Sequence, residues 1–400
     1  MGEKLTVKDF GPIRSATLDI KKITVLIGPQ GSGKSTLAKL LAIFNNPNFL
    51  VDAYIGKKVE DYFSRFQIQY FLNSSSSFEY SSNNFQAKFK VNDFSFQITE
   101  EEDFLETSAK SYFPSLQSLK NEWLRYNERV QRGTSNMNTI LTSIVLPSLL
   151  KKTTSLTHQT KYLPTDRIFI SSISDSILGL LTANIALQKS TIEFGNYFEI
   201  ARTHVSNLPI GYLNIAYKYE NGRNLIYYNE QDSVPLSASA SGHQSSIPLH
   251  VTIEHFSKEG DNLFIVEEPE LNLFPITQKN LIQFLIEKCG DNNHLVITTH
   301  SPYVLSTINN LLFAYQTAKA IPDKEAELAS IIPKSQWINP KDFSAYYVGE
   351  DKEGNKGGVK SIFNEKTGLI SENELDEISE SLGDDFDSIM QIYKMRNRER

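Results

Sequence analysis

The sequence Gly28-Pro29-Gln30-Gly31-Ser32-Gly33-Lys34-Ser35, followed by Thr36, fits the P-loop pattern G-x-x-x-x-G-K-[ST] without a gap. Residues 22–27 before it predict a buried strand, and residues 35–41 after it predict a helix. Glycines let a backbone wrap phosphate oxygens, and a helix N-terminus directs N–H groups at them. The stretch therefore predicts a nucleotide site in which Lys34 reaches the β- and γ-phosphates and Ser35 holds Mg²⁺. A turn that binds nothing would not require this lysine and hydroxyl.

The composition is that of a soluble globular chain of one large or two modest domains, with 400 residues, 40% hydrophobic and 22% charged. A net charge of −7 gives no overall attraction to nucleic acid or to an anionic membrane, and it leaves a local basic surface open. Cys289 is the single cysteine, which excludes an internal disulfide and predicts a cytoplasmic location. The best apolar run, residues 177–187, is too short to span a membrane.

Alternating apolar and polar residues predict three antiparallel pairs along the chain. Residues 5–10 and 16–20 flank Gly11-Pro12, residues 85–91 and 94–98 form a hairpin, and residues 210–219 and 224–228 are joined by Asn221-Gly222. Helical patterns are expected at 103–132, 137–150 and 167–205. The stretch 46–160 carries no motif and is interpreted as an insertion.

Residues 263–268 combine a buried strand with an acidic end, Leu263-Phe264-Ile265-Val266-Glu267-Glu268. In a P-loop protein this is the Walker B strand, whose first acid holds Mg²⁺ and whose second polarises the attacking water. Glu267 is therefore the predicted metal ligand and Glu268 the predicted catalytic carboxylate. An exposed strand terminus is the alternative.

Two further segments complete the predicted site. His300 ends a buried strand at 295–299, after a helix at 278–288, which places it at the tip of the strand beside Walker B and within reach of a γ-phosphate. Ser241, Gly242 and Gln244 open a helical run, and small residues at a helix N-terminus make an anion site.

These motifs, in this order, resemble the ABC-type ATPases, and more closely the SMC-like and OLD-like ATPases. Residues 267–275, Glu-Glu-Pro-Glu-Leu-Asn-Leu-Phe-Pro, are similar to the Glu-Pro-Glu…Leu-His-Pro run of the OLD-like group. Residues 162–167, Tyr-Leu-Pro-Thr-Asp-Arg, resemble its Tyr-Ile-Pro-Ala-Glu-Arg element. The likeness covers residues 1–45 and about 160–395.

The resemblance implies an α/β fold, an ABC-type head with a mixed central sheet, an antiparallel side sheet and a mainly helical insertion. The expected division is an N-terminal lobe at 1–45, the insertion at 46–160 and a C-terminal lobe at 161–400. ATP and Mg²⁺ are the implied cofactors. A homodimer or higher oligomer is implied too, in which Ser241, Gly242 and Gln244 act in trans on the partner's nucleotide.

The chain departs from the family pattern at several site positions. Glu267 stands where aspartate is usual, Ala240 and His243 replace a leucine and a glycine of the signature, and Phe274 replaces a histidine. Each departure is a reason to expect slow hydrolysis. The glutamine of the metal-sensing loop has two candidates, Gln67 and Gln69.

Three functional classes remain open. The resemblance favours an ATPase sensor or scaffold of a prokaryotic defence system that works with a separate effector, often a nuclease, since nothing after residue 302 resembles a TOPRIM nuclease and residues 372–387 predict closing helices. An SMC-like genome-maintenance ATPase lacks its coiled-coil arm here, and a transporter subunit is opposed by the insertion. The insertion is expected either to hold the partner protein or to act as a passive lid.

Overall fold

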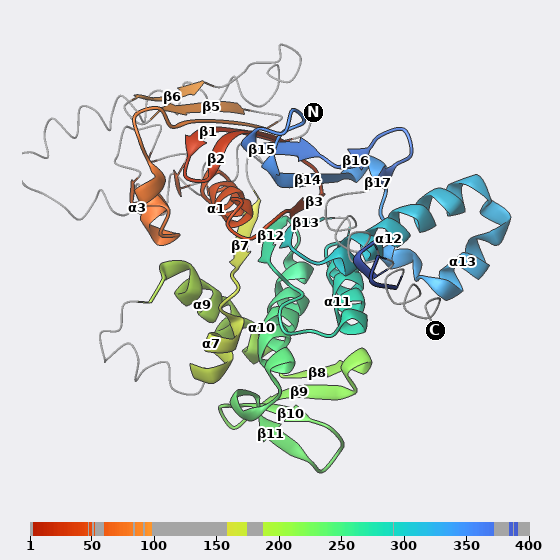
Figure 1. Ribbon diagram of the computed structural model, residues 1–400. Coiled ribbons are helices and arrows are strands. Elements are labelled where there is room, and N and C mark those ends of the chain that lie inside the picture. The colour runs from red at the N-terminus through yellow and green to blue at the C-terminus, as the bar shows by residue number, and fades with distance from the viewer. Residues whose placement is uncertain are drawn as a thin grey trace, which may run out of the picture.

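The computed structural model describes residues 3–46, 48–49, 52, 60–82, 85–90, 93–97, 158–173, 187–290, 292–371, 384–386 and 388–390 (Figure 1). The helical segments expected at 103–132 and 137–150 lie outside these residues, as does most of the acidic stretch 372–387. Within the described part of the chain, no helix is both long and apolar enough to cross a membrane.

A six-stranded mixed sheet forms the centre of the molecule, with the strand order β15-β14-β3-β13-β12-β7. All neighbours pair in parallel except β15, which is antiparallel to β14. The near-continuous apolar runs of its inner strands suit a sheet covered on both faces, and the predicted strands at 22–27, 263–268 and 295–299 are confirmed. The strands are β3 (Ile23–Ile27), β7 (Gln159–Leu163), β12 (Asn262–Glu267), β13 (His294–Thr299), β14 (Phe343–Glu350) and β15 (Lys356–Ser361).

A second, antiparallel sheet has the order β2-β1-β4-β5-β6. Its strands are β1 (Glu3–Phe10), β2 (Ile13–Ile20), β4 (Ser77–Ser82), β5 (Phe85–Lys90) and β6 (Asp93–Gln97). Both predicted pairs, around Gly11-Pro12 and at 85–98, are confirmed. Because β4 pairs with β1, part of the stretch assigned to the insertion extends the sheet that the N-terminus begins. The domain boundary at residue 46 stays a prediction.

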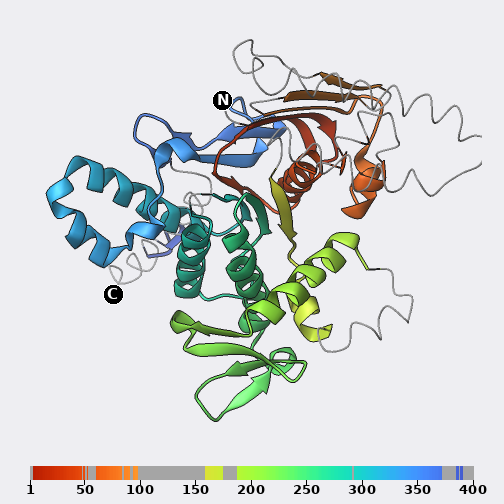
Figure 2. The ribbon, with the colours of Figure 1, turned by 180° about the vertical axis from the view of Figure 1, so that it is seen from behind.

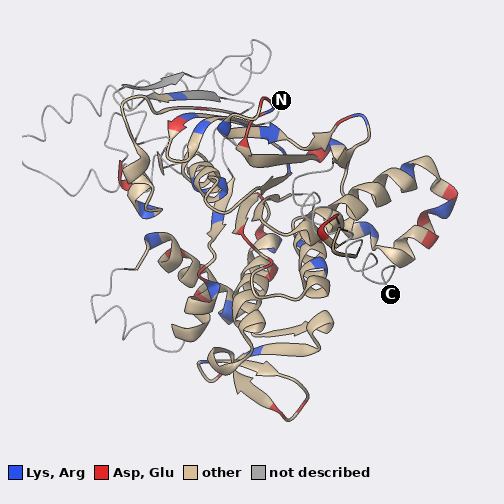
Figure 3. Cartoon of the chain, viewed as in Figure 1, with Lys and Arg blue, Asp and Glu red and all other residues tan. Residues whose placement is uncertain are grey.

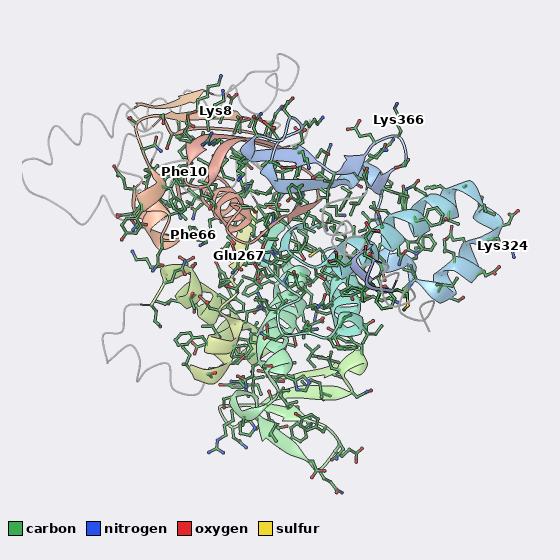
Figure 4. The ribbon with its side chains drawn as sticks, viewed as in Figure 1. Lys8, Phe10, Phe66, Glu267, Lys324 and Lys366 are labelled. Atoms are coloured by element: carbon green, nitrogen blue, oxygen red, sulfur yellow. The ribbon has the colours of Figure 1, made fainter. Side chains whose placement is uncertain are left out.

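Helix α1 (Lys34–Phe44) fills the space between these two sheets. Its last residue, Phe44, stacks on Phe89 of β5 with ring centroids 5.3 Å apart, and Phe10 of β1 meets Phe78 of β4 edge-on at 5.0 Å. Edge-on and offset aromatic pairs add to the stability that burial alone provides. The short helix α3 (Glu60–Arg65) contributes Phe63 to the same cluster, whose region is marked by Phe10 and Phe66 in Figure 4.

Most of the remaining helices pack on the other face of the central sheet, where Val25, Ile27 and Val266 point. They are α7 (Arg167–Ile173), α9 (Lys189–His204), α10 (Ser241–Phe256), α11 (Pro275–Lys288) and α12 (Pro302–Ala320), after which α13 (Glu325–Ile331) projects outward (Figure 1). Helices α7 and α9 occupy the two ends of the predicted helical region at 167–205. The pair β16 (Phe363–Asn364) and β17 (Leu369–Ile370) lies beside α12.

A four-stranded sheet lies at the end of the molecule opposite the β1–β6 sheet, as both views show (Figures 1 and 2). Its strands are β8 (Asn207–Ile210), β9 (Ile215–Glu220), β10 (Arg223–Tyr227) and β11 (Ser233–Pro235). Asn221 and Gly222 have φ of 51° and 77°, so the predicted hairpin turn is confirmed. The strand expected over 210–219 is divided, because Gly211 begins a short 3₁₀ turn that ends at left-handed Asn214.

A partly exposed ionic cluster joins the amino ends of three strands. His158, before β7, lies 2.7 Å from Asp261 Oδ1 through Nδ1 and 3.4 Å from Glu3 Oε1 through Nε2. Burial lowers the pKa of His158, but the hydrogen bonds and charges of Glu3 and Asp261 together outweigh it, so the pKa is raised overall. The folded chain therefore holds this proton more tightly than the unfolded chain does.

Replacing His158 by glutamine is expected to lower the free energy of unfolding in a pH-dependent way. Protonated His158 stabilises the fold below its unfolded pKa of about 6.5, and this contribution is lost as the pH rises through the raised folded pKa. Urea unfolding at several pH values measures it: the difference between wild type and His158→Gln should be largest near pH 6 and shrink above it. Glu3→Gln should reduce the same pH dependence, because Asp261 alone then stabilises the proton on His158. A difference that does not change with pH would contradict the assignment.

Candidate nucleotide-binding and hydrolysis site

The parallel register of the central sheet brings the predicted motifs to one edge. Glu267 of β12 stands opposite Thr298 of β13, and Thr299 stands opposite Ile27 of β3. The P-loop, Glu268 and His300 each follow the carboxyl end of one of these strands. In open α/β sheets this edge is where ligands bind.

The P-loop connects β3 to α1 through glycines that no other residue replaces without strain. Gly28 has φ of 151°, and a Cβ there would lie 2.1 Å from the carbonyl oxygen of Val348 in β14. Gly33 has φ of 107°, and its Cβ would lie 2.4 Å from Ile13 Cδ1. The loop is thus enclosed on one side by β14 and on the other by the turn between β1 and β2.

A chain of polar contacts links the P-loop to the acidic pair. The buried Lys34 ammonium donates to the carbonyl oxygens of Gly28 and Pro29, both at 2.8 Å, and lies 3.2 Å from His300 Nδ1. His300 Nε2 lies 2.5 Å from Glu268 Oε1 and donates to it, because a carboxylate only accepts. Burial lowers the pKa of Lys34, and the charges of three nearby glutamates oppose the shift. Lys34, His300 and Glu268 therefore form one continuous group.

Glu270 fixes the position of His300, a role that the sequence does not assign. Its Oε1 accepts hydrogen bonds from Thr299 Oγ1 at 2.6 Å and from the His300 backbone N–H at 2.8 Å. The Glu-Pro-Glu run at residues 268–270 includes Glu270, but the run alone does not indicate what this residue contacts. A pocket of about 520 Å³ adjoins this network and is lined by Glu268, Glu270, His300 and the exposed Phe274, among others.

Glu267 has the features of a metal ligand. Its side chain is buried close to α1 near the centre of the molecule (Figure 4), and its Oε1 has no hydrogen-bond partner. Burial raises the pKa of Glu267, and the charge of Lys39 and the hydroxyls of Ser35 and Tyr162 offset this only in part, so the pKa is raised overall. A divalent cation held by Glu267 and Ser35 would satisfy the unpaired oxygen and keep the carboxylate ionised. The residues present therefore fit Mg²⁺.

The signature residues lie apart from this group. Ser241 is exposed at the first turn of α10, and a Cβ on Gly242 would lie 3.0 Å from the carbonyl oxygen of Asn272. Gln244 Nε2 donates a hydrogen bond to the carbonyl oxygen of Ser239, just before α10, at 2.7 Å. Among the described residues, no hydrogen bond joins Ser241, Gly242 or Gln244 to the P-loop.

Of the remaining predicted residues, some belong to the P-loop region and others have no hydrogen bond to the site within the described part of the chain. Gln30 and Gly31 are exposed at the tip of the P-loop, whereas Thr36 is buried and Ser32 Oγ is buried without a hydrogen-bond partner. For the metal-sensing glutamine, Gln67 and Gln69 lie next to α3, and no hydrogen bond between described residues connects either to the site. Their assignment, like the residue roles above, stays a prediction.

The mixed sheet, the P-loop at its carboxyl edge and the acidic strand end beside it define a P-loop nucleotide-binding protein of the α/β class. The AAA ATPase domain family matches residues 1–305, and the chain belongs to this family. The family supports nucleotide binding and ATP hydrolysis in general.

Comparison with solved structures gave similar chains of low sequence identity. An SMC head bound to the C-terminal winged-helix domain of ScpA has 12% identity and a TM-score of 0.47, covering 92% of this chain and 99% of its own. The SMC head domain from Thermotoga maritima has 13% identity and a TM-score of 0.38, covering 77% and 92%. An SMC head from Pyrococcus furiosus with an extended coiled coil, bound to the C-terminal domain of ScpA, has 10% identity and a TM-score of 0.39. The match covers 95% of this chain and 98% of the SMC chain. Comparison with curated protein sequences gave no significant match.

Lys34→Ala is expected to abolish nucleotide binding, whereas Glu268→Gln should preserve binding and lower kcat by about 10²-fold or more. The reason is that the Lys34 ammonium lies inside the P-loop, whereas the Glu268 carboxylate lies at its edge and hydrogen-bonds to His300. Titration with a fluorescent ATP analogue in Mg²⁺ and a phosphate-release assay measure the two properties. Lys8→Ala, which removes an exposed lysine from β1, is the control for loss of charge. Equal loss of binding in Lys34→Ala and Glu268→Gln would refute this division of roles.

Proposed function

We propose that the chain is a Mg²⁺-dependent ATPase that pairs around ATP and controls a separate effector, a nuclease in the simplest case, in a cytoplasmic prokaryotic defence system. The observation that carries the ATPase proposal is the unbroken contact from Lys34 through His300 to Glu268. It joins a phosphate-binding lysine, a polar sensor and a carboxylate at the open edge of the sheet.

Each residue has a distinct part in the proposed reaction. The P-loop amides and Lys34 stabilise the phosphate charge that develops during transfer. Glu268 accepts a hydrogen bond from the attacking water and orients it, and His300 reports the γ-phosphate to Glu268 through their shared contact. Mg²⁺ at Ser35 and Glu267 would neutralise phosphate charge when bound. The longer Glu267 side chain, in place of aspartate, favours slow turnover.

Pairing of two copies follows from the exposed signature. Ser241 and Gly242 stand at a helix N-terminus, which attracts anions, and neither bonds to the P-loop of its own chain within the described residues. We infer that they complete the nucleotide site of a second copy, with Gln244 holding the first turn of α10 through Ser239. The active species is then at least a homodimer.

Glu268→Gln protein with ATP is expected to sediment as a dimer, because bound ATP that is not hydrolysed holds the two heads together. Analytical ultracentrifugation with and without ATP measures it. Ser241→Arg, which places a bulky side chain at the shared surface, should keep the same protein monomeric. Lys34→Ala mixed with Ser241→Arg should recover part of the turnover that each variant lacks alone, because a mixed dimer combines the intact P-loop of one copy with the intact Ser241 of the other. A monomer in ATP, or no recovery on mixing, contradicts action in trans.

The defence assignment rests on the run from Glu267 to Pro275. In the OLD-like group this run is the distinguishing element, and here its Glu270 holds the switch residue His300 in place. An SMC-like genome-maintenance ATPase is the second candidate, since an SMC-like head suits either system. DNA binding separates the two.

ATP turnover is expected to change less than about twofold when duplex DNA is added. The net charge is −7, and Lys and Arg positions alternate with Asp and Glu positions over the described part of the chain (Figure 3), so these described residues offer little attraction to phosphate backbones. Steady-state turnover at low salt with increasing DNA measures the effect. Stimulation of tenfold or more would favour the genome-maintenance candidate over the defence candidate.

A further inference from the structure

Arg167 opens α7, and its side chain is completely buried. Among the described residues, its guanidinium donates four hydrogen bonds, all to backbone carbonyl oxygens: Nη1 to Pro164 and Glu267, both at 2.7 Å, Nη2 to Glu268 at 2.6 Å, and Nε to Ser245 at 3.0 Å. These carbonyls belong to the segment after β7, to the acidic pair and to α10. One side chain therefore holds three separate parts of the chain together.

Burying a guanidinium among carbonyls is unfavourable unless every donor is used. Burial lowers the pKa of Arg167 to about 10, although the charges of Glu270, Glu267 and Glu268 oppose the shift. The group is thus still charged at neutral pH. An apolar side chain would fill the same space at lower cost but could not fix the carbonyls. The planar, forked shape of arginine suits this multiple contact, and lysine cannot reproduce it.

Helix α7 has a second attachment to the signature. Ser171 Oγ donates to the backbone carbonyl of Gln244 at 2.6 Å, and Ser172 Oγ lies 3.4 Å from Gln244 Oε1. The same short helix thus contacts the acidic pair through its first residue and the first turns of α10 through its later ones. Those first turns carry the residues proposed to act on a second copy's nucleotide.

The acidic pair needs such support because Glu268 has φ of 42°, a left-handed conformation that is unfavourable for a residue with a side chain. Its N–H donates to the Thr298 carbonyl at 2.9 Å, and its carbonyl accepts from Arg167. The backbone of Glu268 is therefore held on both sides, by β13 and by α7.

We propose that Arg167 is a positioning residue that sets the Glu267–Glu268 backbone against the first turns of α10. This inference rests on the proposed ATPase function and deepens it. The carboxylate that orients water in one site and the signature offered to the other site then move as one unit. Arg167 itself touches neither nucleotide nor metal in this scheme.

Arg167→Lys is expected to lower kcat roughly 10- to 100-fold while KM and the Kd of an ATP analogue change less than about threefold, because misplacing a reacting group slows the chemical step more than it weakens binding. Arg202→Lys is the matched control. Arg202 is also buried, but it pairs with Glu199 and packs over Tyr219, so its kcat should stay near wild type. Thermal unfolding of both variants is measured in parallel.

Ser171→Ala removes one α7 contact with little change in volume and serves if Arg167→Lys does not fold. A smaller fall in kcat, about threefold, is expected with KM unchanged. If Arg167→Lys folds and keeps wild-type kcat, the inference is overturned and the ATPase proposal stays intact. If only Ser171→Ala folds, wild-type kcat in that variant has the same meaning. The inference is also overturned if Arg167→Lys and Arg202→Lys lose kcat equally and each loss of kcat is proportional to the loss of thermal stability. A wild-type protein that binds ATP without hydrolysing it overturns the proposed function itself.

Discussion

Parallel pairing of β3, β13 and β12 is the constraint on which the site depends. The ladder aligns Ile27 with Thr299 and Glu267 with Thr298, so three loops from distant parts of the sequence begin at one level. A shift of one residue in either pairing would turn the side chains of one strand to the opposite face. Val25 and Leu26, which enter different hydrophobic cores on the two faces, oppose such a shift. The two cores thus fix the geometry of the chemistry at the sheet edge.

Sequence motifs located the P-loop, the acidic strand end and His300, because each is a local pattern with a physical reason for its spacing. The sequence did not locate the contacts that support them. Glu270 and Arg167 act on backbone groups of segments far away in the chain, and such pairings have no local signature. Strand β14 was also missed, although residues 343–348 form an apolar run, because no motif marks it as a neighbour of β3. The predicted insertion at 46–160 did not anticipate that β4 joins the N-terminal sheet, because β4 pairs with β1 across about 70 residues of chain.

Polar groups in the site are satisfied mainly through the backbone. Arg167 uses carbonyl oxygens, Lys34 rests on the carbonyls of Gly28 and Pro29, and Glu270 accepts a main-chain N–H from His300. Such contacts fix main-chain position directly, whereas contacts between side chains leave it free to adjust. Exceptions among the described site residues include Glu267 Oε1, Glu270 Oε2 and Ser32 Oγ, which are buried without hydrogen-bond partners. The backbone hydrogen bonds hold the site in place, and its unpaired buried oxygens are available to bind ligands.

The position of β14 has a consequence for protein synthesis. The P-loop strand β3 is made early, but its sheet neighbours β13 and β14 begin only at residues 294 and 343. Gly28 packs against the Val348 carbonyl, so the wall of the P-loop comes from a strand made long after the loop itself. Sheets built from such distant segments form slowly, and their unpaired strands are exposed to aggregation in the meantime. A nascent chain therefore carries the whole P-loop sequence long before β14 is available to enclose it.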